Sequence, residues 1–271
     1  MHIETHSSDQ HSEEVSYSFT TRKKNNVGTI SERLLNPGVL SYDVPDSICD
    51  YDCREQITNT IITPFSGICQ LISTFEGQKY IGTGWLCYTN NSKYEVIVTA
   101  GHCVYAKSLD KYAESVVVIP ARNGNERPYG TYEVSSGLLK ASKRWISSGA
   151  ITDDYGVVLI PKNQALHNYN MWVASDSELD GRYALNSGYP GDKLPFGSSW
   201  MSSGPIDHVD REILNYMNDT YGGQSGSPVL TVNNDSTIVS VGIHAYGGCP
   251  NRAVRITETV RNEILYDLAK C

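Results

Sequence analysis

The stretch Gly222-Gly223-Gln224-Ser225-Gly226-Ser227-Pro228-Val229 holds a serine between glycines and then enters an apolar run. Two other stretches also place a polar side chain at the end of an apolar run. Val98-Thr99-Ala100-Gly101-His102-Cys103 leads into a histidine in a glycine-containing turn. Asp153-Asp154-Tyr155-Gly156-Val157-Val158-Leu159-Ile160 begins with carboxylates directly before an apolar run. The chain therefore presents histidine, aspartate and serine in that order.

This set of residues fits nucleophilic acyl transfer. A serine hydroxyl is a poor nucleophile at neutral pH and needs a histidine base, which a buried carboxylate must orient. Glycines beside the serine let the backbone N–H groups of Gly223 and Ser225 point at a developing oxyanion. Each motif alone is weak, because a lone Gly-x-Ser-Gly is more often a turn. The order His, Asp, Ser strengthens the prediction, since unrelated hydrolase folds use other orders.

Short apolar runs separated by Gly, Pro, Asn and Asp continue from about residue 60 to the C-terminus. This spacing is typical of an all-β barrel or sandwich. One helix is expected near the end, where Thr257 can cap a segment with Val260, Ile264, Leu265 and Leu268 on one face. The predicted strands are 68–74, 79–88, 94–99, 115–119, 156–160, 182–188, 229–232 and 237–244.

Composition limits the classes of partner. The 271 residues carry a formal net charge of −8, which argues against nucleic acid or an anionic membrane as a partner. The apolar runs are too short to span a membrane. Residues 1–46 are polar and aperiodic, and we interpret them as a propeptide or a disordered N-terminal segment. The folded domain is expected at residues 47–271, and no signal peptide is expected in this chain.

The cysteines favour a secreted protein. Seven cysteines are present, so at least one is unpaired if the others form disulfides, and none has the spacing of a zinc ribbon. We favour a few disulfides in a secreted protein over buried thiols in a reducing cell. The pairing is not deducible from the sequence.

Several motifs together resemble the chymotrypsin-fold serine peptidases, and most closely their bacterial glutamyl endopeptidase branch, which includes V8 protease. The resemblance covers residues 47–271 and implies a chymotrypsin-like double six-stranded β-barrel with a C-terminal helix and the active site between the barrels. It rests on TAGHCVY (99–105), DYGVVLI (154–160), GYPGDK (188–193), GGQSGSPV (222–229), GIH (242–244) and REQITNT (54–60).

The resemblance assigns roles to single residues. It implies that His102 is the general base, Asp154 the orienting carboxylate and Ser225 the nucleophile. Asp153 is the alternative for the carboxylate. The N–H groups of Gly223 and Ser225 match the oxyanion hole.

Specificity for the substrate residue before the scissile bond (P1) remains open between two alternatives. His244 matches the family histidine that meets a substrate glutamate, and Thr220 matches a hydroxyl that helps to hold it. An imidazole, protonated or hydrogen-bonding, suits a carboxylate, which would raise its pKa. Asp219 stands six residues before Ser225, where trypsin carries the aspartate that selects Lys or Arg. Trypsin also has a cysteine four residues before its serine, but Tyr221 occupies that position here. We expect cleavage after Glu, with Asp as an extension, and keep a basic P1 residue as the alternative.

Two features depart from the family pattern. Cys103 fits one half of the usual disulfide, but Gly82 stands where its partner belongs, and Cys87 lies five residues later on the opposite strand face. The mature N-terminus falls near Ser47, in a local sequence unlike that of the family.

The sequence thus predicts a secreted serine endopeptidase that acts on protein or peptide substrates as a monomer. Its chemistry needs no metal or organic cofactor. If all 271 residues are retained, the chain is a zymogen. The alternative from another class is a non-catalytic binding protein on the same fold.

Overall fold

The computed structural model describes residues 39–41, 48–49, 51–163 and 166–270. The chain divides into two compact units, Met1–Ser31 and Glu32–Cys271, and every described residue belongs to the second. Of the predicted N-terminal segment 1–46, only strand β1 (Val39–Ser41) is described, and the predicted terminus at Ser47 lies outside the described residues.

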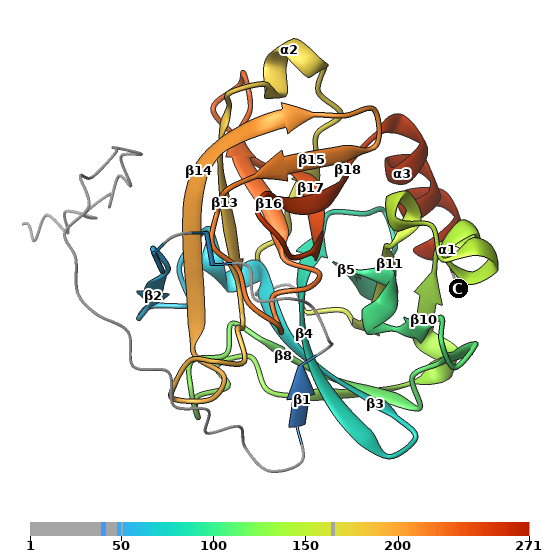
Figure 1. Ribbon diagram of the computed structural model, residues 1–271. Helices are drawn as coiled ribbons and strands as arrows, with labels where there is room; N and C mark the ends of the chain where they lie inside the picture. Colours follow the sequence, from blue (N-terminus) through green and yellow to red (C-terminus); the bar gives the residue numbers. More distant parts are fainter. Residues whose placement is uncertain (1–38, 42–47, 50, 164–165, 271) are drawn as a thin grey trace, which may run out of the picture. The chain divides into compact units, whose positions relative to one another are not determined.

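Within this described part of the chain, the first eight-stranded sheet is nearly closed. Its strands run in the order β10-β11-β5-β4-β3-β8-β9, and β1 pairs with β4 (Figure 1). The bounds are β3 (Ile68–Phe75), β4 (Gln78–Cys87), β5 (Tyr94–Thr99), β8 (Ser115–Pro120), β9 (Tyr132–Ser135), β10 (Leu139–Ala141) and β11 (Gly156–Pro161).

The second sheet closes on itself. Its order is β12-β17-β16-β13-β14-β15-β18, and an additional pairing of β17 with β18 completes a ring of six strands in the described residues. The bounds are β2 (Glu55–Ile57), β12 (Asn170–Met171), β13 (Tyr183–Gly188), β14 (Ser199–Val209), β15 (Ile213–Tyr216), β16 (Pro228–Val232), β17 (Ile238–Tyr246) and β18 (Asn251–Arg255).

Alternation along the strands builds separate cores. Ile97 in β5 joins the core of the first sheet, whereas its neighbours Val96 and Val98 point the other way, because successive side chains alternate faces. Val96 and Val98 enter a cluster that also holds Leu230 and Ile243 from the second sheet. This shared cluster joins the two sheets, so the loops at their boundary have a rigid base.

The C-terminal helix packs into that shared cluster. Helix α3 (Glu258–Glu263) begins after Thr257, whose side chain accepts a hydrogen bond from the N–H of Val260 at 3.3 Å, and η5 (Ile264–Leu268) continues it. The Tyr155 hydroxyl donates to Glu263 Oε2 at 2.5 Å, which fastens the helix beside β11 (Figure 1).

Smaller elements complete the fold, and no described helix is long and apolar enough to cross a membrane. They are α1 (Lys143–Ser148), α2 (Asp176–Leu179), η1 (Phe65–Gly67), η2 (Gly101–Cys103), η3 (Ser136–Leu138), η4 (Ile151–Asp153), β6 (Tyr105–Ala106) and β7 (Lys111–Tyr112).

The predicted double barrel and C-terminal helix are confirmed, and all eight predicted strands are present with ends that match or differ by one or two residues. The sequence did not predict β14, although it is the longest described strand. Its residues SWMSSGPIDHV include Gly and Pro and lack a clean apolar alternation, which weakens the strand signal.

Candidate active site

His102 and Asp154 come together because two neighbouring strands end at the same edge of the first sheet. Thr99, the last residue of β5, pairs with Gly156, the first residue of β11. The turn after β5 carries His102, and the turn before β11 carries Asp154. His102 Nδ1 lies 2.7 Å from Asp154 Oδ2, and the His102 backbone N–H donates to Asp154 Oδ1 at 2.8 Å.

Burial makes this pair electrostatically strong. The Asp154 side chain is fully buried, while that of His102 keeps 15% of its surface exposed. Burial lowers the pKa of His102, but the charge of Asp154 and the contact with Cys103 outweigh it and raise the pKa well above 6.5. Asp153 instead accepts from the Thr152 hydroxyl at 2.9 Å and pairs with Arg144. Asp154, not Asp153, is thus the carboxylate bonded to His102.

The segment that carries Ser225 is fixed by its backbone. The Ser225 carbonyl accepts from the N–H of Thr83 at 2.8 Å, and Cys103 Sγ lies 3.6 Å from the same oxygen. This places Ser225 beside the residue that follows His102. Gly226 has φ +90°, and a Cβ there would collide with the Thr83 carbonyl and the Thr99 hydroxyl. Only glycine fits this position.

The peptide between Gly222 and Gly223 has a defined orientation. The Gly222 carbonyl accepts from the N–H of Gly191 at 2.8 Å. Because N–H and C=O point to opposite sides of a trans peptide, the N–H of Gly223 is directed away from Gly191. Gly223 itself has φ +105°, which favours glycine at this turn.

Thr83 in β4 holds this loop together, and sequence reasoning missed it. Its hydroxyl donates to the Gly223 carbonyl at 2.8 Å and accepts from the N–H of Tyr189 at 3.0 Å. Its backbone carbonyl accepts from the Thr99 hydroxyl at 2.7 Å. Thr83 is fully buried and lies in an ordinary strand pattern, so no local signal distinguished it.

His244 is a buried residue at the end of a polar chain. The amide of Asn218 donates to Asn186 Oδ1 at 2.9 Å, and the amide of Asn186 donates to the Tyr216 hydroxyl oxygen at 3.3 Å. The Tyr216 hydroxyl lies 2.7 Å from His244 Nδ1. Because the Tyr216 oxygen already accepts a hydrogen bond and burial raises the pKa of this phenol, its own proton is available for Nδ1. His244 then carries its proton on Nε2.

Two states were expected for the His244 imidazole, a protonated one and a neutral one that forms hydrogen bonds, and its pKa favours the neutral one. Burial, with repulsion from His102, lowers the pKa of His244 to about 3 in the unliganded protein. The imidazole is therefore neutral at ordinary pH and presents an N–H donor rather than a positive charge. Thr220 is fully buried, and its hydroxyl donates to Asn251 Oδ1 at 3.0 Å.

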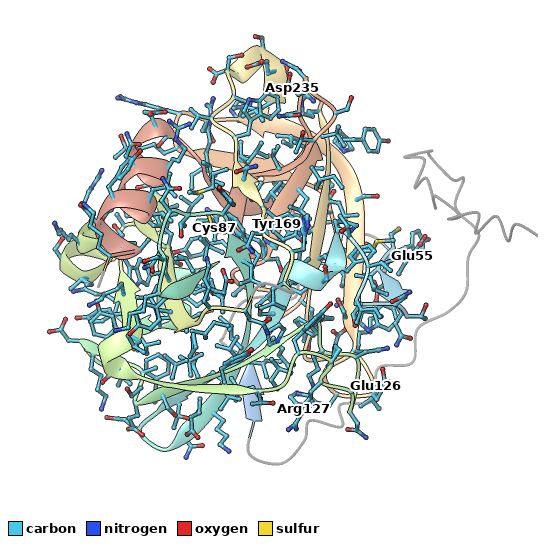
Figure 2. The ribbon with its side chains drawn as sticks, turned by 180° about the vertical axis from the view of Figure 1, so that it is seen from behind. Glu55, Cys87, Glu126, Arg127, Tyr169 and Asp235 are labelled. Atoms are coloured by element: carbon cyan, nitrogen blue, oxygen red, sulfur yellow. A yellow bond between two sulfur atoms is a disulfide. The ribbon has the colours of Figure 1, made fainter. Side chains whose placement is uncertain are left out.

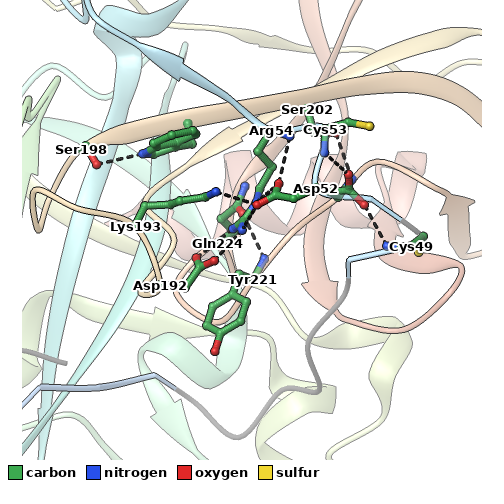
Figure 3. A network of polar contacts seen from close by, with 12 residues as sticks. Cys49, Asp52, Cys53, Arg54, Asp192, Lys193, Ser198, Ser202, Tyr221 and Gln224 are labelled. Carbon is green, nitrogen blue, oxygen red and sulfur yellow. Dashed lines mark hydrogen bonds and ion pairs between the residues drawn. The ribbon is translucent and has the colours of Figure 1, made fainter. Parts of the chain in front are cut away.

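Asp219 faces the N-terminal part of the described chain. Its Oδ1 accepts from the N–H of Cys49 at 2.9 Å and its Oδ2 from the N–H of Cys53 at 2.7 Å (Figure 3). Burial raises the pKa of this carboxyl, although the two amides oppose the shift. A carboxylate engaged in this way is directed at its own chain rather than at a substrate cation.

The cysteine pattern departs from the family as expected. A Cβ at Gly82 would lie 2.9 Å from Cys103 Sγ, so Gly82 stands at the position that the family pattern gives to a second cysteine. The backbone of Cys87 pairs with that of Val96 in the sheet, and it forms an isolated β-bridge with Tyr169 on the side seen in Figure 2. The described residues contain one disulfide, between Cys49 and Cys249.

No protein-family model matches the chain, but individual proteins do. It is 33% identical over 256 residues to the glutamyl endopeptidase of Bacillus licheniformis, covering 90% of this chain and 76% of the relative. It is 34% identical over 228 residues to an extracellular metalloprotease of Bacillus subtilis, covering 82% and 70%. It is 46% identical over 79 residues to the glutamyl endopeptidase of Staphylococcus aureus strain MRSA252, and this match covers 28% of this chain and 20% of the relative.

Solved structures agree. A Glu endopeptidase in complex with MPD has a TM-score of 0.70 and 27% identity, over 82% of this chain and all of the other. The protease Anisep from Arthrobacter nicotinovorans has a TM-score of 0.63 at 21% identity, over 80% of this chain and all of the other, which shows the fold.

The fold and the comparisons define a chymotrypsin-fold serine endopeptidase, an enzyme that acts on protein substrates. Within that class, the chain belongs to the glutamyl endopeptidase family. This membership replaces the alternative of a non-catalytic binding protein. The metalloprotease name of the Bacillus subtilis relative has no matching donor set: no group of three or more His, Cys, Asp or Glu among the described residues is placed to hold a metal ion.

Proposed function

We propose that this enzyme cleaves peptide bonds after glutamate, and after aspartate as an extension, through His102, Asp154 and Ser225. The observation that carries the glutamate preference is the buried, neutral His244, whose Nδ1 is occupied by the Tyr216 hydroxyl. That arrangement leaves an Nε2–H donor suited to a carboxylate.

The chemistry follows from the hydrogen bonds of His102. As Ser225 Oγ attacks the scissile carbonyl carbon, His102 Nε2 takes the hydroxyl proton, and Asp154 stabilises the imidazolium through Nδ1. The C=O double bond becomes a single bond to an oxyanion, which the N–H groups of Gly223 and Ser225 stabilise. The imidazolium then protonates the leaving amine, and the C–N bond breaks to leave an acyl-enzyme. Water, deprotonated by His102, attacks that ester and releases the acid and Ser225.

Two side chains surround the base. The Trp145 ring meets the His102 ring edge-on at 6.4 Å, and the Tyr246 ring lies tilted at the same distance. The Trp145 N–H donates to the Tyr105 carbonyl at 3.1 Å, so the indole is held in place. These rings limit the access of water to the His102–Asp154 pair, which strengthens its electrostatic interaction.

The alternative preference for Lys or Arg has less support. It requires the Asp219 carboxylate to face the P1 side chain, but both of its oxygens accept backbone amides of Cys49 and Cys53. A cation in the pocket would have to compete with those two hydrogen bonds.

Secretion and activation by removal of residues 1–46 are part of the proposal. The Bacillus subtilis relative is named extracellular, and the Cys49–Cys249 disulfide suits an oxidising compartment. A cut near Ser47 would keep Cys49 in the mature chain, and the disulfide to Cys249 would then hold the new N-terminus close to the folded domain.

Covalent labelling tests this function. The active enzyme and its Ser225→Ala variant would be treated with two phosphonate diesters that differ only in a Glu or Lys side chain at P1, and the modified residue would be located by mass spectrometry. We expect the Glu reagent to modify Ser225 faster than the Lys reagent and to leave the variant unlabelled. Faster labelling by the Lys reagent would overturn the glutamate preference, and labelling at another residue would overturn the assignment of Ser225.

A further inference from the structure

We propose that Asp219 is a positioning residue that fastens an N-terminal strap, Cys49 and residues 51–54, against the P1 pocket, together with the Cys49–Cys249 disulfide. The inference rests on the proposed function, because it assigns to the strap a share in binding an acidic P1 side chain. It gives Asp219 a purpose other than selecting a basic substrate residue.

The first fastening is the carboxylate itself. Asp219 is 3% exposed, and its two oxygens accept the N–H groups of Cys49 and Cys53 at 2.9 and 2.7 Å. Its own N–H donates to the Ser202 hydroxyl of β14 at 2.9 Å. The side chain therefore connects the strap to the start of the segment 219–225, which ends at the nucleophile. Hydrogen bonds to an ionised acceptor are stronger than neutral ones, so this connection is firm.

The second fastening lies at the other wall of the pocket. Cys49 forms a disulfide with Cys249, with the two Cα atoms 5.8 Å apart. Cys249 follows β17, the strand that carries His244. One residue of the strap is thereby tied both to the Asp219 segment and to the segment after His244, which are the two segments that the proposed pocket uses.

The third fastening holds the far end of the strap (Figure 3). The buried guanidinium of Arg54 donates to Asp192 at 2.9 and 2.5 Å and to Asp52 at 2.9 Å, and Lys193 Nζ lies 2.6 Å from Asp52. Arg54 also lies over the Tyr221 ring at 5.7 Å. This explains why REQITNT and GYPGDK occur in the same chain: Arg54 of one is the counter-ion of Asp192 in the other.

The consequence is a division of labour. The strap is bonded to Asp219 and to Cys249, which belong to segments on both sides of the proposed pocket. Loosening the strap should therefore weaken the binding of an acidic P1 residue and leave the chemical step almost unchanged.

The test compares Asp219→Asn with Asp235→Asn, an exposed aspartate in the turn between β16 and β17 that undergoes the same chemical change (Figure 2). An asparagine at 219 keeps one acceptor and turns the other into a donor that opposes a backbone N–H. We expect KM for a Glu-P1 peptide to rise about tenfold in Asp219→Asn, with kcat within about twofold of the original. Hydrogen exchange at the Cys49 and Cys53 amides should accelerate in that variant only. An unchanged KM with unchanged exchange would overturn the proposal.

A second variant protects the test against misfolding at Asp219. Cys49→Ser/Cys249→Ser removes the disulfide without leaving a single thiol, and it should also raise KM with kcat preserved. A reducing agent should raise KM in the original enzyme and have no further effect in the double variant. If both variants lower kcat and leave KM unchanged, the strap acts on the chemical step and the inference is wrong. If the original enzyme itself does not cleave after Glu, the proposed function fails first, which the same assay distinguishes.

Discussion

Replacing the Thr83 hydroxyl should damage both stability and catalysis, although Thr83 is not expected to touch the substrate. Valine has nearly the shape of threonine, so Thr83→Val removes two hydrogen bonds with little change in packing. The Gly223 carbonyl loses its donor at 2.8 Å and the Tyr189 N–H loses its acceptor at 3.0 Å. Both groups belong to buried residues.

The expected cost follows from those two groups. A buried polar group left without a partner costs about 1–3 kcal/mol, so two such groups cost about 2–6 kcal/mol of unfolding free energy. For a protein of this size the melting temperature should fall by about 4–24 °C. Because the same hydroxyl holds the Gly223 peptide, kcat should also fall, by about tenfold or more.

Thr83→Ser is the matched control, because it keeps the hydroxyl and loses a single methyl group, at a cost of about 1 kcal/mol. Unfolding would be followed by calorimetry in a Ser225→Ala background, which removes self-digestion, and kcat would be measured with Ser225 intact. The interpretation predicts that Val is clearly worse than Ser in both assays. Equal stability and equal kcat for the two variants would refute the role of the hydroxyl.

One pH profile and three variants give four further predictions. In a pH profile of kcat/KM, the midpoint of the acid limb should lie above pH 6.5. The pKa of His102 is raised, so a higher pH is needed to obtain the neutral base. Asp154→Asn should lower kcat/KM by about 10⁴-fold and move that midpoint to lower pH, and an unchanged profile would argue against the pairing seen here. Tyr216→Phe should raise KM for Glu-P1 peptides about tenfold, since His244 loses the donor that fixes its tautomer, and steady-state kinetics would show it. Gly226→Ala should destabilise the fold by about 2 kcal/mol or more, because alanine resists the φ of +90°, and a melting curve should reveal the loss.

Local patterns predicted an all-β fold and its main strands, and the family resemblance supplied the double barrel and the pairing of Asp154 with His102. The strand at 94–99 ends in the β-branched run Val96–Thr99, and its end was found to the residue. The turns that carry His102 and Asp154 follow from that strand and its neighbour. The aspartate directly preceding the apolar run was the one bonded to His102, as the family pattern implied.

Residues that act through long-range contacts were not predictable in the same way. Thr83 is 140 residues from its partner Gly223 in the sequence, and the residues next to Thr83 in the sequence do not indicate a hydrogen bond to that carbonyl. The same holds for Asn186 and Tyr216, which serve His244 from separate strands. Such contacts join residues that are far apart in the sequence, so only the folded chain brings them together.

Asp219 shows that sequence spacing alone does not fix which groups a side chain contacts. Its distance from Ser225 matches that of a trypsin-like selector, but the direction of a side chain depends on what lies beside it. Here two backbone amides of the strap take up the carboxylate. The motif REQITNT marked Arg54, the last residue of the strap, but the contact of the strap with Asp219 was not predicted.

The most direct test of the proposed specificity is a P1 scan of the active enzyme beside Ser225→Ala. Matched peptides would carry Glu, Asp, Arg, Leu or Ala before the scissile bond, and kcat/KM would be measured for each. We predict the highest kcat/KM for Glu, a lower value for Asp and no turnover of any peptide by Ser225→Ala. Preferred cleavage after Arg would contradict the role of His244, and turnover by Ser225→Ala would contradict the mechanism.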